Sequence, residues 1–142
     1  MVHTAVLLSC LFFEGLAGGR MSRIGDCKLV IYFIPFQVET YEPITPENIR
    51  EKATYRICVE SEKAGTELLG IVSARLATKG FDSRKVRLLI EDVPGAHEIL
   101  VDSEGHLRAA GEEGVLRRKD FARLKRLLSR IVAQSKSDET RR

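Results

Sequence analysis

The sequence contains no run of about 18 consecutive apolar residues, the length that a transmembrane helix requires, so we expect no transmembrane span. It has no internal self-similarity, which excludes a repeat array. Its net charge is only +3 and its hydrophobic fraction is 44%, and this combination excludes a chain that is disordered throughout. With 142 residues, the chain suffices for one domain whose core needs neither a metal ion nor a disulfide to fold.

The short motifs that mark common catalytic and cofactor sites are also missing. There is no Gly-x-Gly-x-x-Gly, no Gly-Lys-Ser/Thr loop for phosphate groups and no His-Glu-x-x-His for a metal ion. No Cys-x-x-Cys pair and no Gly-x-Ser-x-Gly turn occurs either. We accordingly expect no cofactor and no metal site, and we favour a protein that is not an enzyme.

The first 20 residues, here called the leader, have the layout of a secretory signal peptide. The apolar run of residues 5–13 is followed by the small residues of 15–19 and then by Arg20. Two features depart from that layout, because residues 1–3 contain no Lys or Arg and Glu14 lies just beyond the apolar run.

Three interpretations of the leader stay open. It is a signal peptide; or Met21 is the true start and the protein is cytoplasmic; or Cys10 belongs to a lipoprotein signal. We favour export, to the periplasm or outside the cell. In each case residues 1–20 lie outside the fold, residues 21–134 form a single globular domain, and residues 135–142 form a polar tail.

Two cysteines, Cys27 and Cys58, remain once the leader is set aside. An even pair in an exported protein favours one disulfide. Cys27 precedes an apolar run, and Cys58 lies in a segment where apolar and polar residues alternate, so the sulfurs meet if these segments are neighbouring strands. The alternative is two unrelated thiols, with Cys58 a small core hydrophobe.

The order of hydrophobic patterns predicts an α/β or α+β domain, in which two or three helices pack on one small mixed sheet of four or five strands. The expected order is β-α-β-α-β-β-α. Residues 29–34 form an unbroken apolar run, typical of a central strand whose six side chains are mostly buried. A helical crossover makes the strands at 55–59 and 86–90 parallel if they share a sheet.

The expected elements follow in chain order. The first half has a strand at 29–34, a short helix at 46–53, a strand at 55–59 and a helix that begins after its cap Ser61, includes Leu76 and ends at Gly80. The second half has a strand at 86–90, a hairpin of 97–102 with 106–110, a loop at 111–114 and a helix at 117–133.

The hairpin's expected register pairs Val101 with His106 and Leu100 with Leu107, because this gives one apolar face. Carboxylates gather near this hairpin and the preceding strand end, and we call them the acidic rim: Glu91, Asp92, Glu98, Asp102 and Glu104. Paired acids can perform acid–base chemistry or bind a hard cation, although turns and strand ends also use them as solvated groups. His97 and His106 have no carboxylate at an obvious orienting spacing.

The C-terminal helix is the most asymmetric feature of the chain. Eight Lys and Arg residues against Asp120 alone give residues 116–136 a net charge of +7, which leaves −4 for the rest. Helical spacing gathers four cations on one side, here called the basic stripe: Lys119, Arg123, Arg126 and Arg130. Phe121, Leu124 and Leu128 fall on the opposite side, which we expect to be core. The basic stripe is either a solvated face or a site for an acidic protein, a nucleic acid or an anionic membrane surface.

These patterns favour a small non-enzymatic protein-interaction module, of the inhibitor or immunity type, that binds an acidic partner through the basic stripe. One alternative is a small hydrolase or transferase that uses the acidic rim. Another is a nucleic-acid-binding domain that uses the C-terminal helix, although that helix has no aromatic interleaving and no helix-turn-helix signature.

Overall fold

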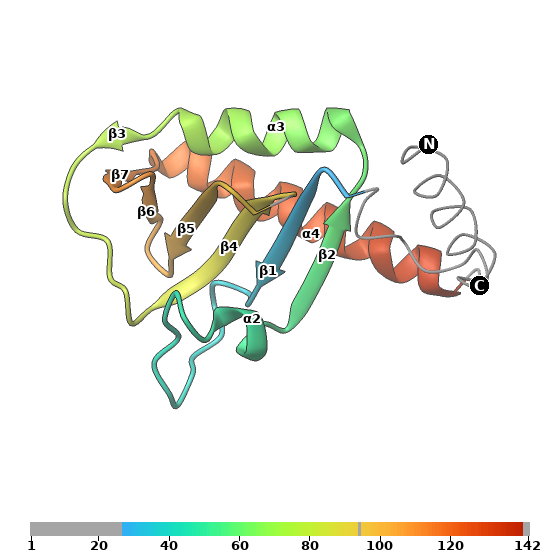
Figure 1. Ribbon diagram of the computed structural model, residues 1–142, viewed down its shortest axis with the longest axis horizontal. Helices are drawn as coiled ribbons and strands as arrows, with labels where there is room; N and C mark the ends of the chain where they lie inside the picture. The colour runs from blue at the N-terminus through green and yellow to red at the C-terminus, as the bar shows by residue number, and fades with distance from the viewer. Residues whose placement is uncertain (1–26, 94, 141–142) are drawn as a thin grey trace, which may run out of the picture.

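The computed structural model of the protein describes residues 27–93 and 95–140. The leader and the alternative start at Met21 lie outside the described residues. Seven strands form one sheet in the described part, and three helices pack on it (Figure 1). The strands are β1 (Leu29–Phe33), β2 (Tyr55–Val59), β3 (Leu76–Ala77), β4 (Val86–Asp92), β5 (Glu98–Asp102), β6 (His106–Ala109) and β7 (Glu112–Val115). The helices are α2 (Ile49–Lys52), α3 (Glu62–Ser73) and α4 (Arg118–Thr140).

The strand order across the sheet is β2-β1-β4-β5-β6-β7-β3, and every neighbouring pair is antiparallel. The expected combination of helices with a single sheet is therefore correct, but the expected mixed sheet of four or five strands is wrong. β2 and β4 do run in the same direction, as the crossover through α3 requires. They are not neighbours, because β1 lies between them and pairs with both.

The prediction of a buried central strand at residues 29–34 is confirmed. β1 lies between β2 and β4, and Tyr32, the most exposed of the six side chains, is only 8% exposed. Alternate side chains of β1 enter two cores. Ile31 faces the core formed with α3 and α4, whereas Val30 faces the core that Ile49 of α2 completes. Burial on both faces explains why the run has no polar side.

Two strands are missing from the sequence prediction. The expected loop at 111–114 is largely strand β7, which pairs with β6 after a tight turn in which Ala110 and Gly111 have positive φ. Leu76 is not part of a helix, because α3 ends at Ser73 and Leu76 pairs with Val115 across the edge of the sheet. Long-range pairing therefore outweighs helical spacing here, and Leu76 stays 47% exposed.

The hairpin register differs by one residue from the expected one. Val101 pairs with Leu107, and Leu100 pairs with Arg108. The cause is the turn, which holds three residues and places Gly105 at φ +89°, the arrangement typical of a three-residue hairpin.

The last helix is longer than expected, because α4 continues past Ala133 to Thr140. Leu124 and Leu128 are completely buried, as predicted, whereas Phe121 is half-buried against the same core. The short helix is also smaller than expected: a turn at 46–48 precedes α2, and Thr45 and Asn48 exchange hydrogen bonds there. No helix in the described residues is both long and apolar enough to cross a membrane.

Candidate binding surfaces

The basic stripe lies on the outer side of α4, opposite the buried leucines. All four of its residues are exposed: Lys119, Arg123, Arg126 and Arg130. Arg130 is engaged, because its Nη2 lies 3.2 Å from both carboxylate oxygens of Glu67 in α3. In the parts of the chain that the structure describes, no carboxylate pairs with the other three. The stripe therefore offers three unpaired cations along one face of a helix that is fixed to α3.

Two further cations of α4 lie over aromatic rings. The Nζ of Lys125 is 4.3 Å from the ring centre of Phe121, and the Nζ of Lys136 is 5.4 Å from that of Tyr55. Both rings are half-buried, and each has a lysine ammonium over its face. A cavity of about 370 Å³ is lined by Tyr55, Lys125 and Lys136, together with Phe36.

Two carboxylates of the acidic rim, Glu91 and Glu98, share an arginine that the sequence did not single out. Glu91 and Glu98 face each other across β4 and β5, and the Nη2 of Arg50 lies 2.9 Å from Glu91 and 2.5 Å from Glu98. Arg50 is far away in sequence and on a different element, so no local pattern indicates this contact. Asp92 pairs instead with His97.

His97 lies in hydrogen-bond contact with Asp92, which corrects the expectation that it has no orienting carboxylate. The Nδ1 of His97 is 2.7 Å from the Oδ2 of Asp92, and its backbone N–H donates to the Oδ1 of the same carboxylate. These hydrogen bonds, the side-chain bond foremost, lower the pKa of Asp92 below its ordinary value. The pair lies at the tip of the β4–β5 hairpin with His97 exposed, and it lines neither the cavity beside Phe36 nor the cavity between the loop 36–43 and the start of β4.

His106 has a weaker relationship with Asp102, at 3.6 Å between Nδ1 and Oδ2. Asp102 is not part of a solvated rim, since it is only 1% exposed. Its oxygens accept the backbone N–H groups of Asp82, Glu104 and His106, at 2.9–3.0 Å. The carboxylate therefore joins the β5–β6 turn to the loop before β4, and both of its oxygens are used in structural hydrogen bonds.

The two cysteines are brought together. Cys27 precedes β1, Cys58 lies in the neighbouring β2, and their sulfurs form a disulfide with a Cα–Cα distance of 5.3 Å. The bond ties the start of the described chain to the edge strand of the sheet.

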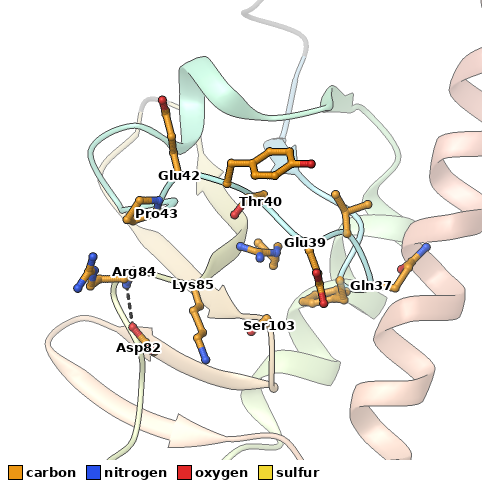
Figure 2. A pocket seen from close by; sticks show the side chains of 13 residues that line it. Gln37, Glu39, Thr40, Glu42, Pro43, Asp82, Arg84, Lys85 and Ser103 are labelled. Carbon is orange, nitrogen blue, oxygen red and sulfur yellow. Dashed lines mark hydrogen bonds between the residues drawn. The ribbon is translucent and has the colours of Figure 1, made fainter.

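An open cavity of about 810 Å³, here called the loop cavity, was not anticipated from the sequence. It lies between the loop 36–43 and the start of β4 (Figure 2). The loop is held there because Ile44 forms a parallel bridge with Lys85, with hydrogen bonds to Arg84 and Val86. Three cations line the cavity, together with hydroxyl, amide, apolar and carboxylate side chains. The polar lining residues are Gln37, Glu39, Thr40, Tyr41, Glu42, Asp82, Arg84, Lys85, Arg87 and Ser103.

Comparison of the chain with known protein families, with curated proteins and with solved structures finds no match.

Proposed function

We propose that the protein is a non-enzymatic binding module that recognises an acidic protein partner through the basic stripe of α4. The observation that carries this proposal is the row of three exposed cations, Lys119, Arg123 and Arg126, for which the described chain supplies no counter-ion. Such a row raises the rate of encounter with a negatively charged surface and favours one orientation of it.

The helix that carries these cations is well fixed, which favours binding. Leu124 and Leu128 hold its inner side in the core, and Arg130 ties its outer side to Glu67. A partner therefore meets charges whose backbone is already ordered, and it avoids the cost of ordering a mobile segment.

A protein partner is favoured over a nucleic acid because the aromatic rings near the basic stripe are not free for base stacking. Single-stranded nucleic acids bind through exposed aromatic rings as well as cations. Phe121 and Tyr55 lie near the cations of α4, but both rings are half-buried and already have Lys125 and Lys136 over their faces.

The enzymatic alternative has less support. General acid–base chemistry needs a carboxylate that faces a substrate site, and Glu91 and Glu98 both face Arg50. The His97–Asp92 pair has the chemistry of a base and its orienting group, but it lies on an exposed turn.

Export of the protein is part of the same proposal. Disulfides form and persist in oxidising compartments, so the bond between Cys27 and Cys58 supports the signal-peptide interpretation of the leader. A cytoplasmic protein that starts at Met21 is the alternative.

The test is affinity capture from the native host, followed by cross-linking that locates the contact on both proteins. The informative variant is Arg123→Glu with Arg126→Glu. Its matched control is Lys63→Glu with Lys79→Glu, which changes the net charge equally at two exposed lysines outside the stripe. We expect the first variant to lose the partner and the control to keep it.

Salt and nuclease treatment complete the test. Screening acts over about 10 Å at 0.1 M salt, so capture should weaken as salt rises. The proposal is wrong if both variants capture the same protein equally well, or if nuclease treatment removes the captured material.

A further inference from the structure

Arg87 is a buried cation with too few partners. It lies in β4 and is only 6% exposed. Its Nη1 donates to the backbone oxygen of Val86 at 3.0 Å, while its buried Nε has no hydrogen-bond partner. A guanidinium has five N–H donors and stays charged in proteins. In the described chain Arg87 therefore lacks the groups that a buried charge normally requires.

Asp102 does not fill this role. It attracts Arg87 through space, but no ion pair joins the two, and three backbone N–H groups already occupy its oxygens. Burial lowers the pKa of Arg87 from its ordinary value, and the attraction to Asp102 offsets this only in part. An additional anion beside Arg87 would stabilise the charge where the protein itself does not.

A β-bulge sets the side chain of Arg87 apart from the regular alternation of β4. The pairing of β4 with β5 shifts between Val86 and Leu88. As a result Val86 and Leu88 enter opposite cores although they are two residues apart. Arg87 is the extra residue, and it lines the loop cavity. Bulges commonly re-aim a side chain in this way beside functional sites.

Other donors line the same cavity. Lys85 and Ser103 are held next to each other, because the backbone N–H of Ser103 donates to the carbonyl of Lys85 at 2.9 Å. Figure 2 shows these two side chains on one side of the cavity and Thr40 on the other. None of the three side chains has a partner within the described residues, so all are free to bind a ligand.

The carboxylates of the lining are mostly engaged. Glu42 pairs with Lys52 at 3.3 Å, and the Oδ1 of Asp82 accepts the backbone N–H of Arg84. Glu39 alone has no described partner. It lies on the exposed loop, whereas Arg87 is buried, so the cavity offers one buried cation at depth and one free acceptor near its mouth.

We propose that the loop cavity binds a small phosphorylated molecule that carries hydroxyl groups. Its phosphate is held by Arg87, Lys85 and Ser103, and its hydroxyls reach Glu39. A phosphate suits this site better than a carboxylate does, because a tetrahedral dianion can accept from a guanidinium, an ammonium and a hydroxyl on different chain segments. The volume of about 810 Å³ is within the range that small-molecule sites occupy.

The experiment is a titration of the full chain, followed by amide NMR shifts at constant ionic strength. The probes are inorganic phosphate, ribose 5-phosphate and acetate. We expect saturable shifts at Lys85, Arg87 and Ser103 with both phosphates, and at least threefold tighter binding of ribose 5-phosphate. Shifts that do not saturate, that are confined to α4, or that are equally strong with acetate would overturn the proposal.

Variants separate this site from the basic stripe. Arg87→Met should weaken phosphate binding at least tenfold. The double variant Lys85→Gln with Ser103→Ala should weaken it equally, and it changes two side chains that lie outside the core. The control Arg123→Gln with Arg126→Gln should bind phosphate with unchanged affinity.

Arg87→Met also separates ligand binding from a structural role. Loss of an unpaired buried charge should raise the melting temperature of the ligand-free protein, whereas a structural role would lower it.

Discussion

Arg50 of α2 lies between two carboxylates that face each other across the sheet, with its Nη2 2.9 Å from Glu91 of β4 and 2.5 Å from Glu98 of β5. Like charges directly opposite each other destabilise a strand pair. The guanidinium therefore does more than attach a four-residue helix to the sheet, because it also makes the pairing of Glu91 with Glu98 tolerable.

Arg50→Ala should accordingly destabilise the protein by about 1 kcal/mol, since Arg50 is 38% exposed and solvent weakens such pairs. Addition of Glu98→Gln should recover part of the loss, because it removes the repulsion. Urea unfolding of the single and double variants measures both effects. If Glu98→Gln adds to the loss instead, the like-charge explanation fails.

The core side of α4 gives a larger effect. Leu124→Ala should cost about 2–5 kcal/mol, because Leu124 is completely buried and its truncation leaves a cavity. Leu69→Ala is a matched control on α3, where the leucine is 37% exposed, and should cost less than about 1 kcal/mol. Equal losses in the two unfolding curves would contradict the assignment of the inner face of α4 to the core.

The disulfide offers a test of both structure and compartment. Protein recovered from an oxidising compartment and titrated under denaturing conditions should show no free thiol at Cys27 or Cys58, which are 31 residues apart and bonded. In the chain-entropy description a closed loop of this length stabilises the fold by about 3–4 kcal/mol, so reduction should lower the unfolding free energy by a comparable amount. Two free thiols in such material would reject the bond.

The sequence predicted elements best where local pattern and tertiary pairing agree. β1 is apolar at every position because both faces of the sheet are covered, so its pattern alone identifies it. β7 contains Glu112, Glu113 and Gly114, so only its pairing with β6 and β3 makes it a strand. Leu76 shows the opposite error. Its spacing fits the apolar side of a helix, but α3 ends at Ser73, before Leu76 is reached.

The candidate sites follow the same division. Helical spacing alone placed the basic stripe on one face of α4, because its residues share one element. The loop cavity brings together residues from 36–43, 82–87 and Ser103, and a bulge sets Arg87 apart from the strand alternation. Neither long-range proximity nor a bulge is visible in hydrophobic periodicity, so Arg87 could not be singled out from the sequence.

The pair of Asp92 and His97 should be visible in a pH titration. The pKa of Asp92 lies below its ordinary value because the ring and backbone of His97 hydrogen-bond to its ionised form. A lowered folded-state pKa stabilises the fold above the unfolded value of 3.8, and this contribution is lost as the pH falls through the folded value. Carboxyl carbon NMR should show His97→Gln raising the pKa of Asp92. An unchanged pKa would mean that the bond does not form in solution.

Asp102 should be the most sensitive polar position of the described chain. Asp102→Ala leaves three backbone N–H groups without their acceptor, at about 1–3 kcal/mol for each one that stays buried, so the variant should lose several kcal/mol or fail to fold. Asp102→Asn keeps one oxygen acceptor and should lose less.

This milder variant, Asp102→Asn, also removes the negative charge that offsets the buried charge of Arg87. In an Arg87→Met background Asp102→Asn should therefore be less costly, with a coupling of about 1 kcal/mol between the two positions. Denaturant unfolding of the four proteins in this cycle measures the coupling, and strictly additive losses would mean that Asp102 serves only the turn.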